Sequence, residues 1–132
     1  MKDTIGYSYF AIKTENEKLD VDEFEKYLSI KPTNFQKMME RRKSPVCTIW
    51  EYSTERLKNP YFFEEIEKLI SKLNEHKLEF IKLKNDYSEI EFVLEVVIHL
   101  GDETPGLHFS KKALEFVTEI GGVIDCDIYN SK

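Results

Sequence analysis

Hydrophobic and polar positions along this chain repeat with two different periods. Alternation with a period of two is typical of strands, and it predicts strands over residues 6–13, 46–53, 90–100 and 123–129. Apolar residues at helical spacing predict helices over residues 20–31, 59–73 and 110–120. The short apolar run 78–83 fits either period, and we interpret it as a helix packed behind the preceding one.

Residues that favour helix ends support these boundaries. Asp20 can cap a helix with Glu23 as its capping-box partner, and Ser110 can cap the last helix. Gly121-Gly122 supplies the left-handed residue that closes a helix. Residues 34–45 are polar and follow neither period, which predicts an irregular loop.

Four strands separated by helices form either a parallel doubly wound sheet or an antiparallel sheet with helices on one side. Buried parallel strands read as continuous apolar runs, whereas residues 90–100 and 123–129 alternate polar with apolar. The chain also lacks a linker or an internal repeat. We therefore expect a single domain over residues 1–132. Its fold class would be α+β and ferredoxin-like, a four-stranded, mainly antiparallel sheet with helices on one face.

Composition and charge narrow the classes of function. With 41% apolar and 33% charged residues, the chain is typical of a globular protein. A net charge of −6 makes general nucleic-acid binding a poor expectation. No apolar run approaches the roughly 20 residues of a membrane span, and no apolar leader follows Met1. We expect a cytoplasmic protein that binds neither nucleic acid nor membrane.

Motifs that would identify a cofactor or a catalytic class are absent from the sequence. Cys47 and Cys126 are not in a C-x-x-C spacing, so we expect two buried free thiols and not a zinc or redox site. Glycine-rich phosphate loops, the G-x-S-x-G motif and the H-E-x-x-H motif are also missing. We expect no cofactor and no bound metal, and an enzyme is the less favoured class.

Polar residues on two predicted strands form the candidate site. Glu91, Glu95 and His99 share one face of residues 90–100, and their spacing of about 13 Å is too long to ligate one ion together. Asp125 and Asp127 share one face of the last strand with Tyr129. These two carboxylates can hold a divalent metal, divide acid and base roles, bind a partner, or simply be the solvated charges of an edge strand.

Further residues each have two interpretations. His99 is either a general base or a surface histidine. Trp50 and Tyr52 are either an exposed anchor for a partner or part of the core. One basic cluster is either an anion site or a solvated loop, and it comprises Lys37, Arg41, Arg42 and Lys43.

Four short segments together resemble a known family. Tyr9-Phe10-Ala11-Ile12 is similar to its opening strand, and residues 28–33 are similar to its Leu-Gly-Ile-x-Pro-Thr pattern, with Ser29 in place of the glycine. Ile49-Trp50 and the segment Asp125-Cys126-Asp127-Ile128-Tyr129 are similar to its second and closing strands. The chain thus resembles the bacterial family named domain of unknown function 4279. The resemblance implies a small single-domain α+β protein and assigns no function, although small bacterial families of this kind include toxin-immunity proteins.

We therefore expect a non-enzymatic protein-binding module, and toxin immunity is the specific role that we consider for it. Its acidic sheet face would bind a basic protein partner through six residues: Glu91, Glu95, His99, Asp125, Asp127 and Tyr129. The alternative is a small enzyme with a carboxylate or histidine site on the same face. A monomer and a homodimer are both compatible with the sequence.

Overall fold

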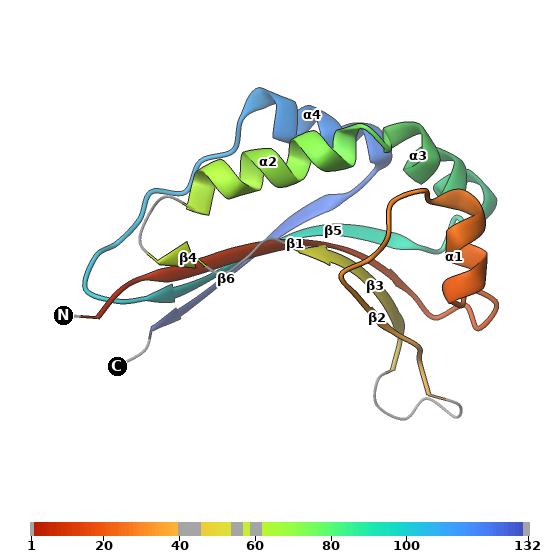
Figure 1. Cartoon of the computed structure of the whole chain (residues 1–132), viewed down its shortest axis with the longest axis horizontal. Coiled ribbons are helices and arrows are strands. Elements are labelled where there is room, and N and C mark those ends of the chain that lie inside the picture. The colour runs from red at the N-terminus through yellow and green to blue at the C-terminus, as the bar shows by residue number, and fades with distance from the viewer. Residues whose placement is uncertain (1, 40–45, 54–56, 59–61, 131–132) are drawn as a thin grey trace.

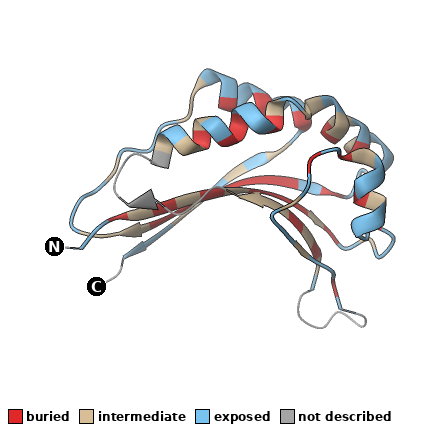
Figure 2. Cartoon of the chain, in the orientation of Figure 1, coloured by how far each residue is buried: buried red, intermediate tan, exposed pale blue. Residues whose placement is uncertain are grey.

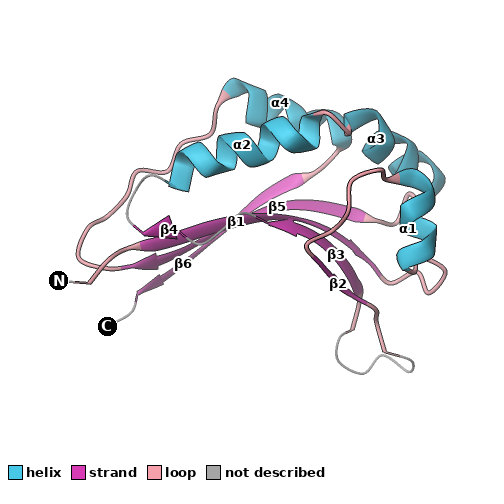
Figure 3. Ribbon diagram, viewed as in Figure 1, coloured by secondary structure: helices cyan, strands magenta, loops and turns pink. Residues whose placement is uncertain are grey.

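The computed structural model of the chain describes residues 2–39, 46–53, 57–58 and 62–130. Its strands are β1 (Ile5–Thr14), β2 (Asn34–Gln36), β3 (Thr48–Ser53), β4 (Leu57–Lys58), β5 (Glu91–Leu100) and β6 (Val123–Asn130). The helices found in these residues are α1 (Val21–Tyr27), α2 (Phe62–Asn74), α3 (Lys77–Asp86) and α4 (Lys111–Ile120). Helices and strands form separate layers (Figure 3). All of these helices lie on one side of the sheet, as predicted (Figure 1).

The sheet is mixed. Its strand order is β2-β3-β1-β5-β6, and β4 pairs with the beginning of β1. β1 is antiparallel to both β3 and β5, whereas β5 and β6 are parallel. The α+β class is confirmed, and most strand pairings are antiparallel, as predicted. The prediction of a four-stranded, ferredoxin-like sheet is wrong, because the sheet has more strands and includes the parallel pair β5–β6. A split βαβ unit of that fold has another strand between the two that it links, and here β5 and β6 are direct neighbours.

The reason for this error lies in how the strands alternate. Parallel strands need a long crossover connection, and α4 with its flanking loops provides one between Leu100 and Val123. Because helices cover only one side of the sheet, even parallel strands here keep one polar face. The segment 34–36, predicted as part of a loop, adds the short strand β2 against β3.

Most predicted helix ends are observed. The Asp20 side chain accepts a hydrogen bond from the Glu23 N–H, and the Ser110 side chain accepts one from the Ala113 N–H. Gly121 has a φ of 74°, the left-handed conformation that glycine adopts without strain. Residues 78–83 belong to the helix α3, as interpreted. The predicted start at Asn59-Pro60 lies outside the described residues.

The core lies between the helices and the sheet, where the buried residues gather (Figure 2). Phe10 on β1 is at its centre, 1% exposed. Its ring lies within 6.5 Å, centroid to centroid, of four other rings, those of Trp50, Phe80, Phe92 and Phe116. These rings join the sheet to α3 and α4, so burial of this aromatic group fixes which side of the sheet faces the helices.

The other side of the sheet, which we call the open face, carries no helix among the described residues. The sheet is bent, and the open face is its concave side (Figure 1). Strand alternation and register place these residues on it: Tyr7, Tyr9, Ala11 and Lys13 of β1; Ile49, Glu51 and Ser53 of β3; Glu91, Val93, Glu95, Val97 and His99 of β5; Val123, Asp125, Asp127 and Tyr129 of β6.

Candidate functional site

The parallel register of β5 and β6 brings together candidate residues from the two strands. Glu95 lies opposite Asp125, and His99 lies opposite Tyr129. Asp127 lies opposite Val97, two residues further along the same face of β6. Glu91 is separate, because it is exposed at the start of β5, opposite Lys13 of β1.

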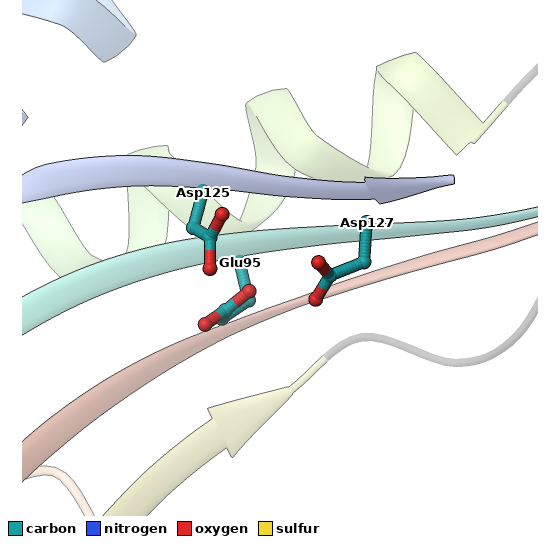
Figure 4. A group of neighbouring side chains, drawn as sticks. All are labelled: Glu95, Asp125 and Asp127. Carbon is teal, nitrogen blue, oxygen red and sulfur yellow. The ribbon is translucent and has the colours of Figure 1, made fainter. Parts of the chain in front are cut away.

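Three of these side chains form a compact group, which we call the carboxylate cluster: Glu95, Asp125 and Asp127. One carboxylate oxygen from each residue lies within 4.8 Å of the other two. Asp125 and Asp127 reach from β6 toward Glu95 on β5 (Figure 4). Three negative charges this close repel one another, so the group favours a proton or a cation among its members.

Glu95 is the buried member of the carboxylate cluster, with 3% of its surface exposed. Its Oε1 lies 3.6 Å from the Nζ of Lys13, whereas its Oε2 has no hydrogen-bond partner among the described residues. Burial raises the pKa of Glu95 above its usual 4.5, Asp125 raises it further, and Lys13 opposes both. An unpaired carboxylate oxygen in a dry site is costly, and a ligand that pairs with it removes that cost.

The centre of the open face is dry although no described helix covers it. Ala11, Val93 and Val97 are each at most 5% exposed. The concave bend and the tight cross-strand packing of neighbouring side chains account for this burial. The alternation of residues 90–100 suggested a mixed, solvated face, and the structure instead places Glu95 in an almost water-free setting.

A row of stacked rings crosses the open face beside the carboxylate cluster. Tyr9 stacks on Tyr7 at 6.3 Å, Tyr7 on His99 at 6.5 Å, and His99 on Tyr129 at 5.0 Å. Burial, followed by the negative charges of Glu95 and Glu51, raises the pKa of Tyr9 to about 12. Tyr9 therefore stays protonated at physiological pH and can donate a hydrogen bond. We call Tyr9, Tyr7, His99 and Tyr129 the aromatic row.

Sequence reasoning selected His99 and Tyr129 but missed Tyr7, Tyr9 and Lys13. The signal was present, because alternation places these three residues on one face of residues 6–13. The sequence did not show which strand pairs with β1. Only the register of β1 against β5 places Tyr9 opposite Glu95 and Tyr7 opposite Val97.

One end of the open face is hollowed. A pocket of about 750 Å³ lies there, and its lining includes Lys13, Cys47, Glu89 and Glu91. The Asn16 side-chain amide, also in this lining, donates to the Glu89 carboxylate at 2.6 Å. The lining does not include Asp125 or His99, so the pocket and the carboxylate cluster are separate places on the same face.

A second group of polar side chains joins the segment after α1 to the beginning of α3. The Ser29 N–H and the Ser29 Oγ–H donate to the two carboxylate oxygens of Glu79, at 2.9 and 2.8 Å. The His76 Nδ1 lies 3.1 Å from the Ser29 Oγ and 3.2 Å from the Glu79 Oε1. A serine nucleophile needs its base to contact serine and acid through opposite ring nitrogens, whereas here one nitrogen contacts both. This group is a structural junction and not a catalytic triad.

The remaining candidates are placed as follows. Trp50 is 1% exposed and belongs to the core, so its interpretation as an exposed anchor is wrong. Lys37 donates to the Glu17 carbonyl, and the rest of the basic cluster lies outside the described residues. Cys47 and Cys126 are free thiols, as expected, but both are half-buried and not fully buried.

Three comparisons bear on identity. The sequence model of a family described as Domain of unknown function (DUF4279) matches residues 4–131 of this chain. Searches of curated proteins and of solved structures found no match. Within the described residues, every helix is too short or too polar to cross a bilayer.

Proposed function

Since this chain belongs to the family described as Domain of unknown function (DUF4279), whose description assigns no activity, we propose from the open face itself that it binds a basic protein partner. The observation that carries this proposal is the carboxylate cluster, which lies on a concave sheet face that no helix of the described residues covers. A convex, positively charged segment of a partner fits this surface in both shape and sign.

Charge on the open face supports the proposal. Among its described residues the acidic ones are Glu51, Glu91, Glu95, Asp125 and Asp127, and the basic ones are Lys13 and Lys58. An excess of one sign on a concave surface focuses the field and speeds the approach of an oppositely charged partner. Acidic residues therefore outnumber basic ones on the open face, so part of the negative charge of the chain is concentrated there.

The aromatic row supports a cationic ligand for a different reason. The negative face of a tyrosine ring attracts arginine or lysine heads within about 6 Å of the ring centre, and Tyr129 ends the row with His99 stacked against it. Tyr129 is 51% exposed at the end of the row, where a partner side chain can reach it. An arginine that paired with Asp127 and lay over Tyr129 would use both interactions.

A basic toxin is one class of partner that suits this surface. Toxic nucleases carry positive surfaces because they bind phosphate, and an acidic inhibitor can cover such a site with electrostatic assistance. An immunity-like role in the cytoplasm is the specific form of our proposal. Its support is the charge and shape of the open face.

The experiment is a titration of a labelled arginine-rich peptide into the protein at low and high salt. We expect saturable binding that weakens at high salt. The variant Asp125→Lys/Asp127→Lys should weaken it at least about tenfold, which is about 1.4 kcal/mol.

A matched control separates the open face from general acidity. Asp22→Lys/Glu25→Lys changes the net charge equally on exposed positions of α1, and it should weaken binding less than about threefold. Equal losses in both variants would mean nonspecific attraction and would refute the proposal. Circular dichroism of both variants confirms that the fold is retained.

An acid–base enzyme is a second candidate, favoured by one observation. Glu95 has a raised pKa and lies beside Asp125, and such unequal carboxyl pairs divide acid and base roles. Against it, the 750 Å³ pocket is lined by other residues, and His99 is stacked between Tyr7 and Tyr129. The binding module is therefore the better-supported function.

A further inference from the structure

The carboxylate cluster has the geometry of a small-cation site. An ion that binds oxygens at up to about 2.4 Å can be shared only by atoms no more than about 4.8 Å apart. One oxygen each from Glu95, Asp125 and Asp127 meets this limit without any movement of the backbone. Two adjacent strands of a rigid sheet hold all three side chains, so the arrangement is already formed.

The unpaired oxygen of Glu95 is a second observation that points to a ligand. The side chain is 5% exposed, and Lys13 accounts for only one of its two oxygens. The other, Oε2, is buried without a hydrogen-bond partner among the described residues. Buried polar atoms in folded proteins are almost always paired, so this atom indicates a position that a bound group completes.

The charge of the site and the type of its ligand atoms indicate which kind of ion it binds. Three carboxylates and the Lys13 ammonium leave a net charge of −2 at this position when all are ionised, which one divalent cation neutralises. Carboxylate oxygens select hard ions such as Mg²⁺, Mn²⁺ and Ca²⁺ over softer metals. Asp125 is exposed, so water can reach the ion and complete its coordination.

We propose that Glu95, Asp125 and Asp127 bind one hard divalent cation, with water as the remaining ligands. This inference goes beyond the proposed function and does not rest on it, because the ion is bound by the chain alone. The ion and a cationic partner side chain would compete for the same carboxylates. From the sequence we expect no bound metal, with a metal at Asp125 and Asp127 only as an alternative that lacks a third ligand. The parallel register of β5 and β6 supplies Glu95 as that ligand.

The test is calorimetric titration of chelator-treated protein with MnCl₂, MgCl₂ and CaCl₂ separately. We expect one saturable site with a Kd of about 1 mM or tighter for at least one ion, and a rise in Tm on binding. Absence of a saturable site for all three ions at this concentration would overturn the proposal.

Variants locate the site. Asp125→Asn/Asp127→Asn keeps the shape of both side chains and should weaken binding at least about tenfold, as should Glu95→Gln. The control Asp22→Asn/Glu25→Gln removes the same number of charges from exposed positions of α1 and should leave the affinity unchanged. Equal weakening by both pairs would place the ion elsewhere and would refute the assignment.

A measurement on the unmodified protein keeps the test valid if a variant fails to fold. Substoichiometric Mn²⁺ broadens the NMR signals of nearby nuclei. The amides of residues 95, 125 and 127 should broaden first. Broadening that is uniform over the surface, or centred on the pocket near Glu89 and Glu91, would contradict the proposal.

Discussion

Glu79 and Glu95 are carboxylates in contrasting settings: 32% of the Glu79 side chain is exposed, against 5% of the Glu95 side chain. Glu79, at the junction of α1 and α3, pairs both of its oxygens with Ser29 and one of them also with His76. Glu95, on the open face, is more deeply buried but has Oε2 unpaired among the described residues. Burial alone would raise the pKa of Glu79, yet hydrogen bonds from Ser29 and His76 lower it below 4.5. Burial and Asp125 raise the pKa of Glu95.

The difference shows that burial by itself does not identify a binding site. A carboxylate whose partners come from the protein stabilises the fold, as Glu79 does. A sheltered carboxylate without a full set of partners destabilises it and gains from a ligand. Glu79 therefore has a structural role, whereas Glu95 has a role in ligand binding at the open face.

The largest expected effect compares the same substitution at the two positions. Glu79→Gln should lower the free energy of unfolding by about 1 kcal/mol at neutral pH, because the charge of the acceptor is lost at a partly exposed position. Glu95→Gln should leave stability unchanged or increase it, since the charge that it removes is repelled by Asp125 and Asp127. Urea unfolding in the presence of a chelator measures both. Equal losses would erase the distinction between the two sites.

A smaller effect is the pH dependence of stability, which should have opposite signs. The pKa of Glu79 is lowered on folding, so its contribution is present above about pH 4.5 and is lost as the pH falls through the folded pKa. The pKa of Glu95 is raised, so its contribution is present below about pH 4.5 and is lost as the pH rises through the folded pKa.

The test measures the free energy of unfolding of the wild type, Glu79→Gln and Glu95→Gln in chelator at several pH values. The difference between the wild type and each variant gives the contribution of that glutamate. Two curves with the same sign would contradict the pKa assignments.

The smallest effect concerns two tyrosines. Burial and then Glu95 raise the pKa of Tyr9 to about 12, and the hydrogen bond to Asp86 raises that of Tyr27 to about 12. Glu95→Gln should therefore lower the pKa of Tyr9 by a fraction of a unit and leave Tyr27 unchanged. NMR of ring-labelled tyrosine follows both. A shift at Tyr27, or none at Tyr9, would show that Glu95 does not act on its cross-strand neighbour.

Local pattern was enough to predict most elements of the fold. The caps at Asp20 and Ser110 and the alternation in residues 90–100 depend on nearby residues alone, and each appears where expected. The partner of the last strand could not be predicted, because the α4 crossover can place that strand at more than one position in the sheet. The three-residue strand β2 is too short to show a period.

The sequence predicted which strand face carries each residue of the candidate site, but it did not predict how deeply Glu95 is buried. Alternation placed Glu95 on one face of its strand and Asp125 on one face of another, and these faces coincide. Nothing in the alternation says that Ala11, Val93 and Val97 exclude water around Glu95. Burial on an uncovered face depends on sheet curvature and on neighbours from β1, which are properties of the assembled sheet.

The position of β6 at the margin of the sheet has a consequence for biosynthesis. This strand holds two of the three clustered acids and follows α4 in the chain, so it is synthesised after β5, the strand that carries Glu95. Until it docks, Glu95 sits at a temporary border where solvent can still hydrate it. The repulsion between Glu95 and the two aspartates therefore arises only when β6 pairs with β5, and a ligand that relieves this repulsion also favours the paired position of β6.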